Sequence, residues 1–102
     1  MATLAAALAE AAAELAGVTR RESAGATEYV FGDAPFAVVE SGGDAASFRL
    51  SSAVAAAAVH TPDTVTSSRG PGWVTLQPTL VDDHAIDRAV AWLQSAWRNA
   101  GG

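Results

Sequence analysis

The residues of this chain that could recognise a ligand gather in a glycine-rich loop, Ser68-Arg69-Gly70-Pro71-Gly72, which runs into Trp73. A guanidinium can pair with a phosphate or carboxylate, and glycines expose backbone N–H groups that bind anions. The indole could stack on a base or another flat ligand. The alternative is a solvated loop, because a lone arginine beside glycines is common in turns. The candidate binding residues here are Arg69, Gly70, Gly72 and Trp73.

Three further arginines extend this candidate site. Arg49 alternates with Phe48 in a predicted strand, so its side chain should point away from the core. Arg49, Arg20 and Arg21 would then join Arg69 in a basic patch on an open sheet face. The alternative is a set of scattered surface ion pairs, worth under about 1 kcal/mol each. The glutamates available to form them are Glu22, Glu28 and Glu40.

The sequence offers little for catalysis or metal binding. His60 and His84 are the only histidines, and there is no cysteine. His84 has aspartates nearby, but successive helical residues point in different directions, so these carboxylates are expected to cap a helix. The serines lack a nucleophile-elbow context and the glycines lack a phosphate-loop pattern. We therefore expect no catalytic residue, no metal, no cofactor and no enzyme; a deep pocket joining a histidine to Asp and Arg would reverse that expectation.

Length and charge narrow the class of protein. The 102 residues suit one domain, residues 1–102. Eleven acidic residues against six basic ones, all arginine, give a net charge of −5, which disfavours strong nucleic-acid binding. Alanine richness and the use of arginine alone suggest a GC-rich bacterial genome. The lack of cysteine fits the cytoplasm, and no apolar run approaches the roughly 20 residues that span a bilayer.

Hydrophobic periodicity and turn residues predict the elements that position these side chains. Residues 18–26 are interpreted as a loop with some extended character, and Ser41-Gly42-Gly43-Asp44 as a hairpin turn. Thr3, Ser51 or Ser52, and Asp82 or Asp83 are the expected helix caps. The predicted helices cover residues 3–17, 53–60 and 83–99, and the predicted strands 27–31, 35–40, 45–50, 64–68 and 73–77.

The predicted order is α-β(3)-α-β(2)-α, a single α+β domain whose antiparallel sheet packs on the N- and C-terminal helices. Gly17 is expected to end the first helix. The first helix should bury Leu4, Leu8, Ala11 and Leu15. The last should bury Ile86, Val90, Leu93 and Trp97, with Trp92 on the flank beside Ala85, Ala89 and Ala96.

Several segments resemble the MmcQ/YjbR-like family, small bacterial domains often labelled DNA-binding, with a fold related to type III secretion chaperones. Phe36-Ala37 within residues 30–39 is similar to the family's paired strands. Ser47-Phe48-Arg49-Leu50 before Ser51-Ser52 is similar to its third strand and capped helix. Trp73-Val74-Thr75-Leu76 and the last helix look like its final elements. Many members carry His, Asn and Lys in the loop before that Trp, where this chain has Arg69-Gly70-Pro71-Gly72.

The resemblance implies a bacterial, cytoplasmic, non-enzymatic binding module that recognises its ligand through the exposed sheet and the Arg69 loop. Nucleic acid is one expected partner; a peptide or a small anion is another. The alternative is a protein-interaction or chaperone-like module that acts as a homodimer and binds no nucleic acid. No membrane partner is expected.

Overall fold

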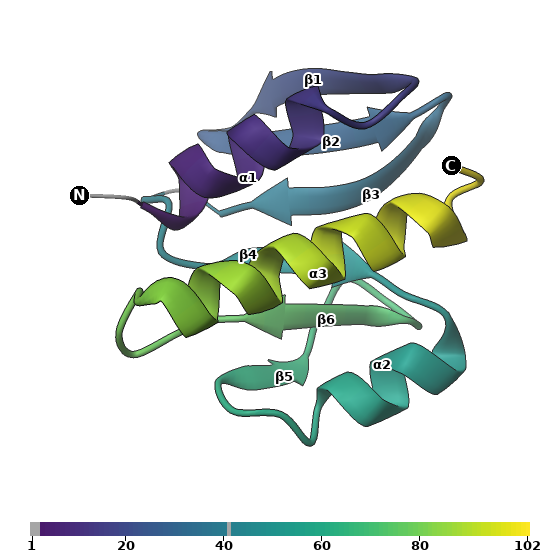
Figure 1. Ribbon diagram of the computed structural model, residues 1–102. Helices are drawn as coiled ribbons and strands as arrows, with labels where there is room; N and C mark the ends of the chain where they lie inside the picture. Colours follow the sequence, from purple (N-terminus) through teal and green to yellow (C-terminus); the bar gives the residue numbers. More distant parts are fainter. Residues whose placement is uncertain (1–2, 41) are drawn as a thin grey trace.

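A computed structural model describes residues 3–40 and 42–102 of the chain. Within them, two helices, α1 and α3, lie side by side across one face of a six-stranded antiparallel sheet (Figure 1). A third helix, α2, lies near β5 and β6 at one end of the sheet. The strand order is β1-β2-β3-β4-β6-β5. The elements are α1 (Leu4–Ala13), β1 (Val18–Ser23), β2 (Ala26–Phe31), β3 (Ala34–Val39), β4 (Ala46–Arg49), α2 (Ser52–Ala58), β5 (Thr64–Thr66), β6 (Trp73–Leu76) and α3 (Asp83–Asn99).

The α+β class, the antiparallel sheet and the contact between the first and last helices are as predicted. The strand count is not. Residues 18–23, predicted as a loop, form β1, which pairs with β2 from Val18↔Phe31 to Ser23↔Ala26. The order is therefore α-β(4)-α-β(2)-α. The sequence of β1 does not alternate between apolar and polar residues. The reason is that β1 is an edge strand with five of its six residues exposed, so neither of its faces needs apolar side chains.

Two tight hairpins set the strand register. Ala24 and Gly25 join β1 to β2 with φ of +51° and +82°, the pair of positive angles that a type I′ turn requires. Gly42 and Gly43 also have positive φ in the predicted turn between β3 and β4, where the Glu40 amide donates to the Ala45 carbonyl at 2.8 Å. Ser41 lies outside the described residues.

Helix ends follow the predicted caps in three cases. The side chains of Thr3, Ser51 and Asp82 accept hydrogen bonds from the amides of Ala6, Val54 and Ala85, at 3.1, 3.3 and 2.9 Å. The prediction that α1 runs to Gly17 is wrong.

Helix α1 ends at Ala13, with Glu14 as its C-cap. Gly17 shapes the link to β1 instead: its φ is +76°, and a Cβ there would lie 2.8 Å from the Phe31 ring.

The core lies between the sheet and the helices. Its largest fully buried side chains on the strands are Phe36, Phe48 and Leu76, and the helices add Leu4, Leu8 and Leu93. Phe36 joins them through an irregularity: the pairing steps from Tyr29↔Ala37 to Val30↔Pro35, which leaves Phe36 as the extra residue of a bulge.

The buried face of α3 differs from the predicted stripe. Ala85, Ala89 and Ala96 are fully buried with Leu93, whereas the predicted Ile86, Val90 and Trp97 are only half-buried. In α1, likewise, Ala12 is buried with Leu4 and Leu8, while Ala11 is half-buried. The predicted Leu15 lies beyond the end of the helix and is also half-buried. Alanine on the contact line lets a helix lie close to the sheet, and the larger side chains then pack beside the contact.

Candidate functional site

The helix-free face of the sheet carries a row of aligned side chains. Register pairs place Glu28 beside Val38, Val38 beside Ser47, and Ser47 beside Thr75, so one residue from each of four neighbouring strands shares this face. Paired residues in a sheet point the same way, and alternation sends Phe48 and Val74 to the helices. Ser47 is nevertheless 1% exposed and Val38 1% exposed, so something other than a helix covers them.

Part of the cover comes from the loop between β5 and β6, which carries Arg69. The Ser67 amide donates to the Trp73 carbonyl at 3.1 Å, and the Arg69 amide donates to Ser67 Oγ at 3.2 Å. Gly72 is required for close approach, because a Cβ there would lie 2.6 Å from the Leu50 carbonyl oxygen and its φ is +81°. Gly70 has a φ of +135°, and a Cβ there would lie 4.0 Å from the Trp73 ring, an ordinary contact. The two glycines therefore have a structural role in shaping this loop.

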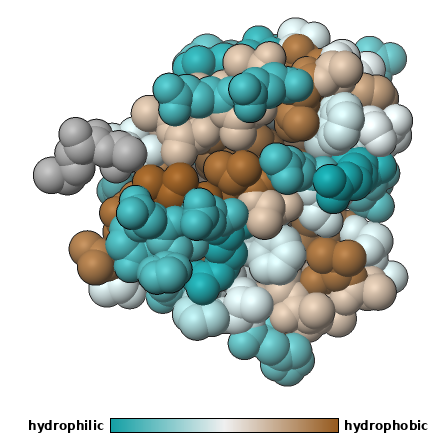
Figure 2. Space-filling view, viewed as in Figure 1, coloured by the Kyte–Doolittle hydropathy of each residue, from teal (hydrophilic) through white to brown (hydrophobic). Residues whose placement is uncertain are grey.

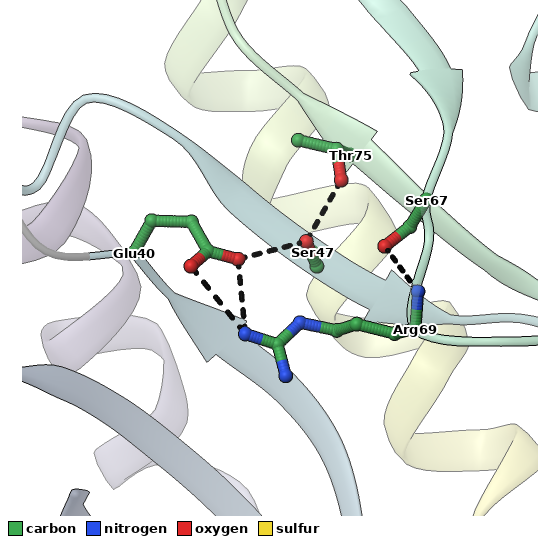
Figure 3. Close-up of polar contacts among 5 residues, drawn as sticks. All are labelled: Glu40, Ser47, Ser67, Arg69 and Thr75. Carbon is green, nitrogen blue, oxygen red and sulfur yellow. Dashed lines mark hydrogen bonds and ion pairs between the residues drawn. The ribbon is translucent and has the colours of Figure 1, made fainter. Parts of the chain in front are cut away.

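Arg69 reaches from this loop across β4 to Glu40 on the far side (Figure 3). Its Nη2 donates to both carboxylate oxygens of Glu40, at 3.1 and 3.4 Å. Ser47 Oγ donates to Glu40 Oε1 at 3.2 Å and lies 2.9 Å from Thr75 Oγ1. The guanidinium carbon is 5.9 Å from the centre of the Trp73 ring, within cation–π range. These contacts form one polar chain, Thr75–Ser47–Glu40–Arg69, over the sheet.

A hollow of about 320 Å³ opens beside that chain. Val38 forms part of its lining, Glu28, Glu40 and Arg69 supply charge, and the end of the β1–β2 hairpin contributes Ser23, Ala24 and Ala26. The hollow is thus bounded by the hairpin on one side and the Arg69–Glu40 pair on the other.

The predicted basic patch is not assembled as expected. Arg20 lies on the helix-bearing face, since it pairs in register with buried Tyr29, and Arg21 shares the helix-free face with Glu28. Each of the three candidate glutamates forms an ion pair with an arginine. The nitrogen–oxygen distances are 3.0 Å for Arg20–Glu22 and Arg21–Glu28, and 3.1 Å for Arg69–Glu40. Arg49 lies opposite Trp73, and among the described residues it forms no ion pair.

The three tryptophans have different surroundings. Trp73 lies on the helix-free face with Thr75, whereas Trp92 and Trp97 pack against the core from α3. Trp97 donates its ring N–H to the Ala16 carbonyl at 3.0 Å and meets Phe31 edge-on at 6.5 Å. The buried ring nitrogen of Trp92 has no hydrogen-bond partner among the described residues.

The two histidines do not approach the polar chain over the sheet in residues 3–40 and 42–102 by any hydrogen bond or ion pair. His60 and His84 are exposed, and His84 lies in α3, on the opposite side of the sheet from Ser47. Ser47 therefore has a carboxylate partner but no imidazole to accept its proton. No group of three potential metal ligands occurs in that same part of the chain.

A second, smaller hollow of about 190 Å³ lies between α1 and the first two strands, lined by Ala9, Ala12, Ala13, Val18, Arg20 and Tyr29. Burial raises the pKa of the Tyr29 hydroxyl, while the nearby Arg20 opposes that rise. Seen from this side of the sheet, brown and tan apolar groups adjoin one another between clusters of polar ones (Figure 2).

Glu40, Ser47 and Thr75 were not predicted as site residues. Alternation along residues 45–50 already sets Ser47 against Phe48, and the same rule sets Thr75 against Val74. Ser47 and Thr75 are 28 residues apart in the chain, and the pairing of β4 with β6 brings them together. That pairing cannot be predicted from the alternation of residues within each strand.

None of the helices in the described residues is both long and apolar enough to cross a membrane. No protein-family model matches the chain, and neither a curated protein nor a solved structure is significantly similar to it.

Proposed function

We propose that this protein is a non-catalytic binding module that engages another protein through the helix-free face of its sheet, and that it does not bind nucleic acid. The observation that carries the proposal is the Arg69–Glu40 pair. The guanidinium that would meet a phosphate is held by a carboxylate on the same face, and both side chains are 36% exposed.

Charge supports the protein partner further. Phosphate binding needs uncompensated cations. Of the three arginines on this face, Arg21 and Arg69 are each paired, so among the described residues of this face Arg49 alone is left without an ion pair, and the chain carries −5 overall. An antiparallel sheet can leave one face free of helices, and that face is then open to a partner. The resemblance to the MmcQ/YjbR-like family is divided on this point: the family's DNA-binding label favours nucleic acid, whereas its related secretion-chaperone fold favours a protein partner.

The partner is proposed to be a different chain rather than a second copy. Two copies meeting through this face would bring together two molecules that each carry a net charge of −5. Like charges placed opposite each other across an interface cost affinity.

Two binding measurements test the proposal. Labelled duplex and single-stranded DNA are titrated with the protein at low and moderate salt, and no saturable binding is expected. A random peptide library displayed on phage is then selected against the protein, and each enriched peptide is mapped by amide chemical shifts. The expected shifts cluster at Glu28, Glu40 and Arg69, the partly exposed residues of this face.

Three outcomes contradict the proposal. The first is saturable, salt-sensitive DNA binding that Arg69→Ala or Arg49→Ala weakens, which would restore the nucleic-acid interpretation. The second is a library that yields no peptide mapping to the helix-free face. The third is a protein that light scattering finds to be a dimer closed through this face, which would make the partner a second copy.

A further inference from the structure

A second candidate binding site lies on the opposite side of the sheet, in the hollow of about 190 Å³ between α1 and the first two strands. Figure 1 shows α1 crossing over β1 and β2 there. The helix lines the hollow with Ala9, Ala12 and Ala13, whose side chains are single methyl groups and leave the space above the strands unfilled. Ala9 and Val18 are half-buried and Ala13 is exposed, so the walls of the hollow have surface that a ligand can contact.

The floor of the hollow carries a polar group without a protein partner. Tyr29 is 3% exposed and lines the hollow, and its hydroxyl makes no hydrogen bond to any described residue. Among those residues, Trp92 Nε1 is the only fully enclosed side-chain nitrogen or oxygen that has no partner. The Tyr29 hydroxyl is therefore not fully enclosed. It borders open space, and the hollow is the open space that Tyr29 lines.

The charges around Tyr29 show which end of its side chain lies at the hollow. Arg20 is the register partner of Tyr29 and lines the same hollow. Burial raises the pKa of the Tyr29 hydroxyl, while the Arg20 charge lowers it and the Glu22 charge raises it, so the hydroxyl lies near this ion pair. A hydroxyl with a raised pKa stays protonated at neutral pH, so it can donate a hydrogen bond as well as accept one.

The hollow offers a ligand no net charge. Among the described residues that line it, Arg20 alone is charged, and its Nη2 is paired with Glu22 Oε1 at 3.0 Å. Apart from Arg20 and Tyr29, the lining consists of alanine and valine. An apolar lining with a single unpartnered hydrogen-bonding group is typical of a small-molecule site, in which apolar contact supplies affinity and the polar group fixes orientation.

We infer that this hollow binds a small neutral molecule with one ring and a hydroxyl group, of the phenol class. An apolar cavity of about 150 Å³ binds benzene. A hollow of about 190 Å³ therefore has room for a ring with one substituent. The ring would pack against Ala9, Ala13 and Val18, and its hydroxyl would form a hydrogen bond with Tyr29. A carboxylate in place of the hydroxyl is disfavoured, because the Arg20 guanidinium is already neutralised by Glu22.

The test uses the full chain and para-fluorophenol as the probe, with its fluorine signal followed by NMR as protein is added. Saturable binding with a millimolar dissociation constant is expected for so small a ligand. The amide shifts that it causes should cluster at Ala9, Ala13 and Val18. Fluorobenzene keeps the ring and lacks the hydroxyl, so it should bind about three- to tenfold more weakly. The charged para-fluorobenzoate should also bind more weakly than para-fluorophenol.

Three variants locate the contact. Tyr29→Phe should weaken para-fluorophenol by about three- to tenfold and leave fluorobenzene unchanged. Ala9→Leu fills the hollow from the helix and should abolish the binding of both. Ala6→Leu is the matched control, because Ala6 is an exposed alanine of the same helix outside the lining, and it should leave affinity unchanged. Thermal unfolding verifies that each variant is folded. Tyr29→Phe should not lower the melting temperature, because no hydrogen bond to a described residue is lost.

Four results would overturn the inference. Binding of para-fluorophenol that does not saturate up to the solubility limit would remove the site. Equal affinity of the wild type and Tyr29→Phe would mean that the hydroxyl does not contact the ligand. A marked loss of stability in Tyr29→Phe would show that the fold itself uses the hydroxyl. Tighter binding of para-fluorobenzoate than of para-fluorophenol would contradict a neutral ligand. Since the hollow lies across the sheet from the proposed protein contact, none of these results affects the proposed function.

Discussion

The two faces of this sheet come from the same strands but are built differently. On β4 and β6, Phe48 and Val74 turn toward the helices and are fully buried among apolar neighbours. The intervening Ser47 and Thr75 turn the other way and hydrogen-bond each other at 2.9 Å. One face is covered by helices, and the other is covered in part by a single loop and one long arginine side chain.

Because the two faces are built differently, we expect the helix-bearing face to determine stability and the helix-free face to determine recognition. Burial of apolar area stabilises the helix-bearing side by about 25 cal/mol per Å², so changes there should cost several kcal/mol. On the helix-free side, partly exposed ion pairs and hydroxyl contacts contribute little each. Residues on that side can therefore specify a partner without determining whether the chain folds.

The largest expected effect is on the helix-bearing side. Leu93→Ala removes the largest fully buried side chain of α3, and should lower the free energy of unfolding by about 2–5 kcal/mol in urea titrations. Leu80→Ala is the control, since Leu80 is 71% exposed and its loss should stay within about 0.5 kcal/mol. Equal effects at the two leucines would contradict the assignment of the core.

Leu93 also shows how much of the buried face of α3 could be predicted from the sequence. It belongs to the predicted stripe, but the centre of the buried face lies on Ala85, Ala89 and Ala96. Periodicity finds a helix and its apolar side, yet it favours large residues over small ones. Where a helix lies close to a sheet, small residues occupy the contact instead of large ones. Only the packed structure shows which residues these are.

The missed strand has a different cause. Residues of β1 are exposed, so pattern alone cannot distinguish them from a loop; their hydrogen bonds to β2 decide it. For the site, the loop with Arg69 was found from glycine content and charge. Its partner Glu40 was named only as a candidate for neutralising the basic patch, because an ion pair spanning 29 residues follows from topology.

The second prediction concerns the loop that covers the helix-free face. Gly72→Ala places a Cβ against the Leu50 carbonyl and keeps a positive φ, so it should destabilise by about 3 kcal/mol or more. Gly42→Ala has the same unfavourable backbone angle but open space, and should cost about 1–2 kcal/mol. The difference between the two losses of stability, measured by thermal unfolding, gives the cost of the steric clash between the new Cβ and the Leu50 carbonyl. Gly42 costing as much as Gly72 would mean that close approach to Leu50 is not what the loop requires.

The third prediction tests the polar chain. Ser47→Ala leaves Glu40 and Thr75 without a buried partner and should cost about 1 kcal/mol. Thr75→Val keeps the shape and removes one hydroxyl, so a double-mutant cycle reports the coupling between the two. A coupling near zero would show that the 2.9 Å contact contributes nothing to stability.

The smallest effect compares two ion pairs on opposite faces. Arg69→Gln should lower the free energy of unfolding by less than about 1 kcal/mol, because the Arg69–Glu40 pair is only partly shielded from water. Arg20→Gln should have a still smaller effect, since Arg20 and Glu22 are 56% and 66% exposed. Both effects should shrink as sodium chloride is raised from about 20 mM to about 500 mM, where screening shortens the range of charge interactions.

A loss above about 2 kcal/mol for Arg69→Gln, insensitive to salt, would mean that this side chain stabilises the fold as a packing element. In that case the helix-free face would not be independent of the core, and the separation of recognition from stability would fail at its central residue.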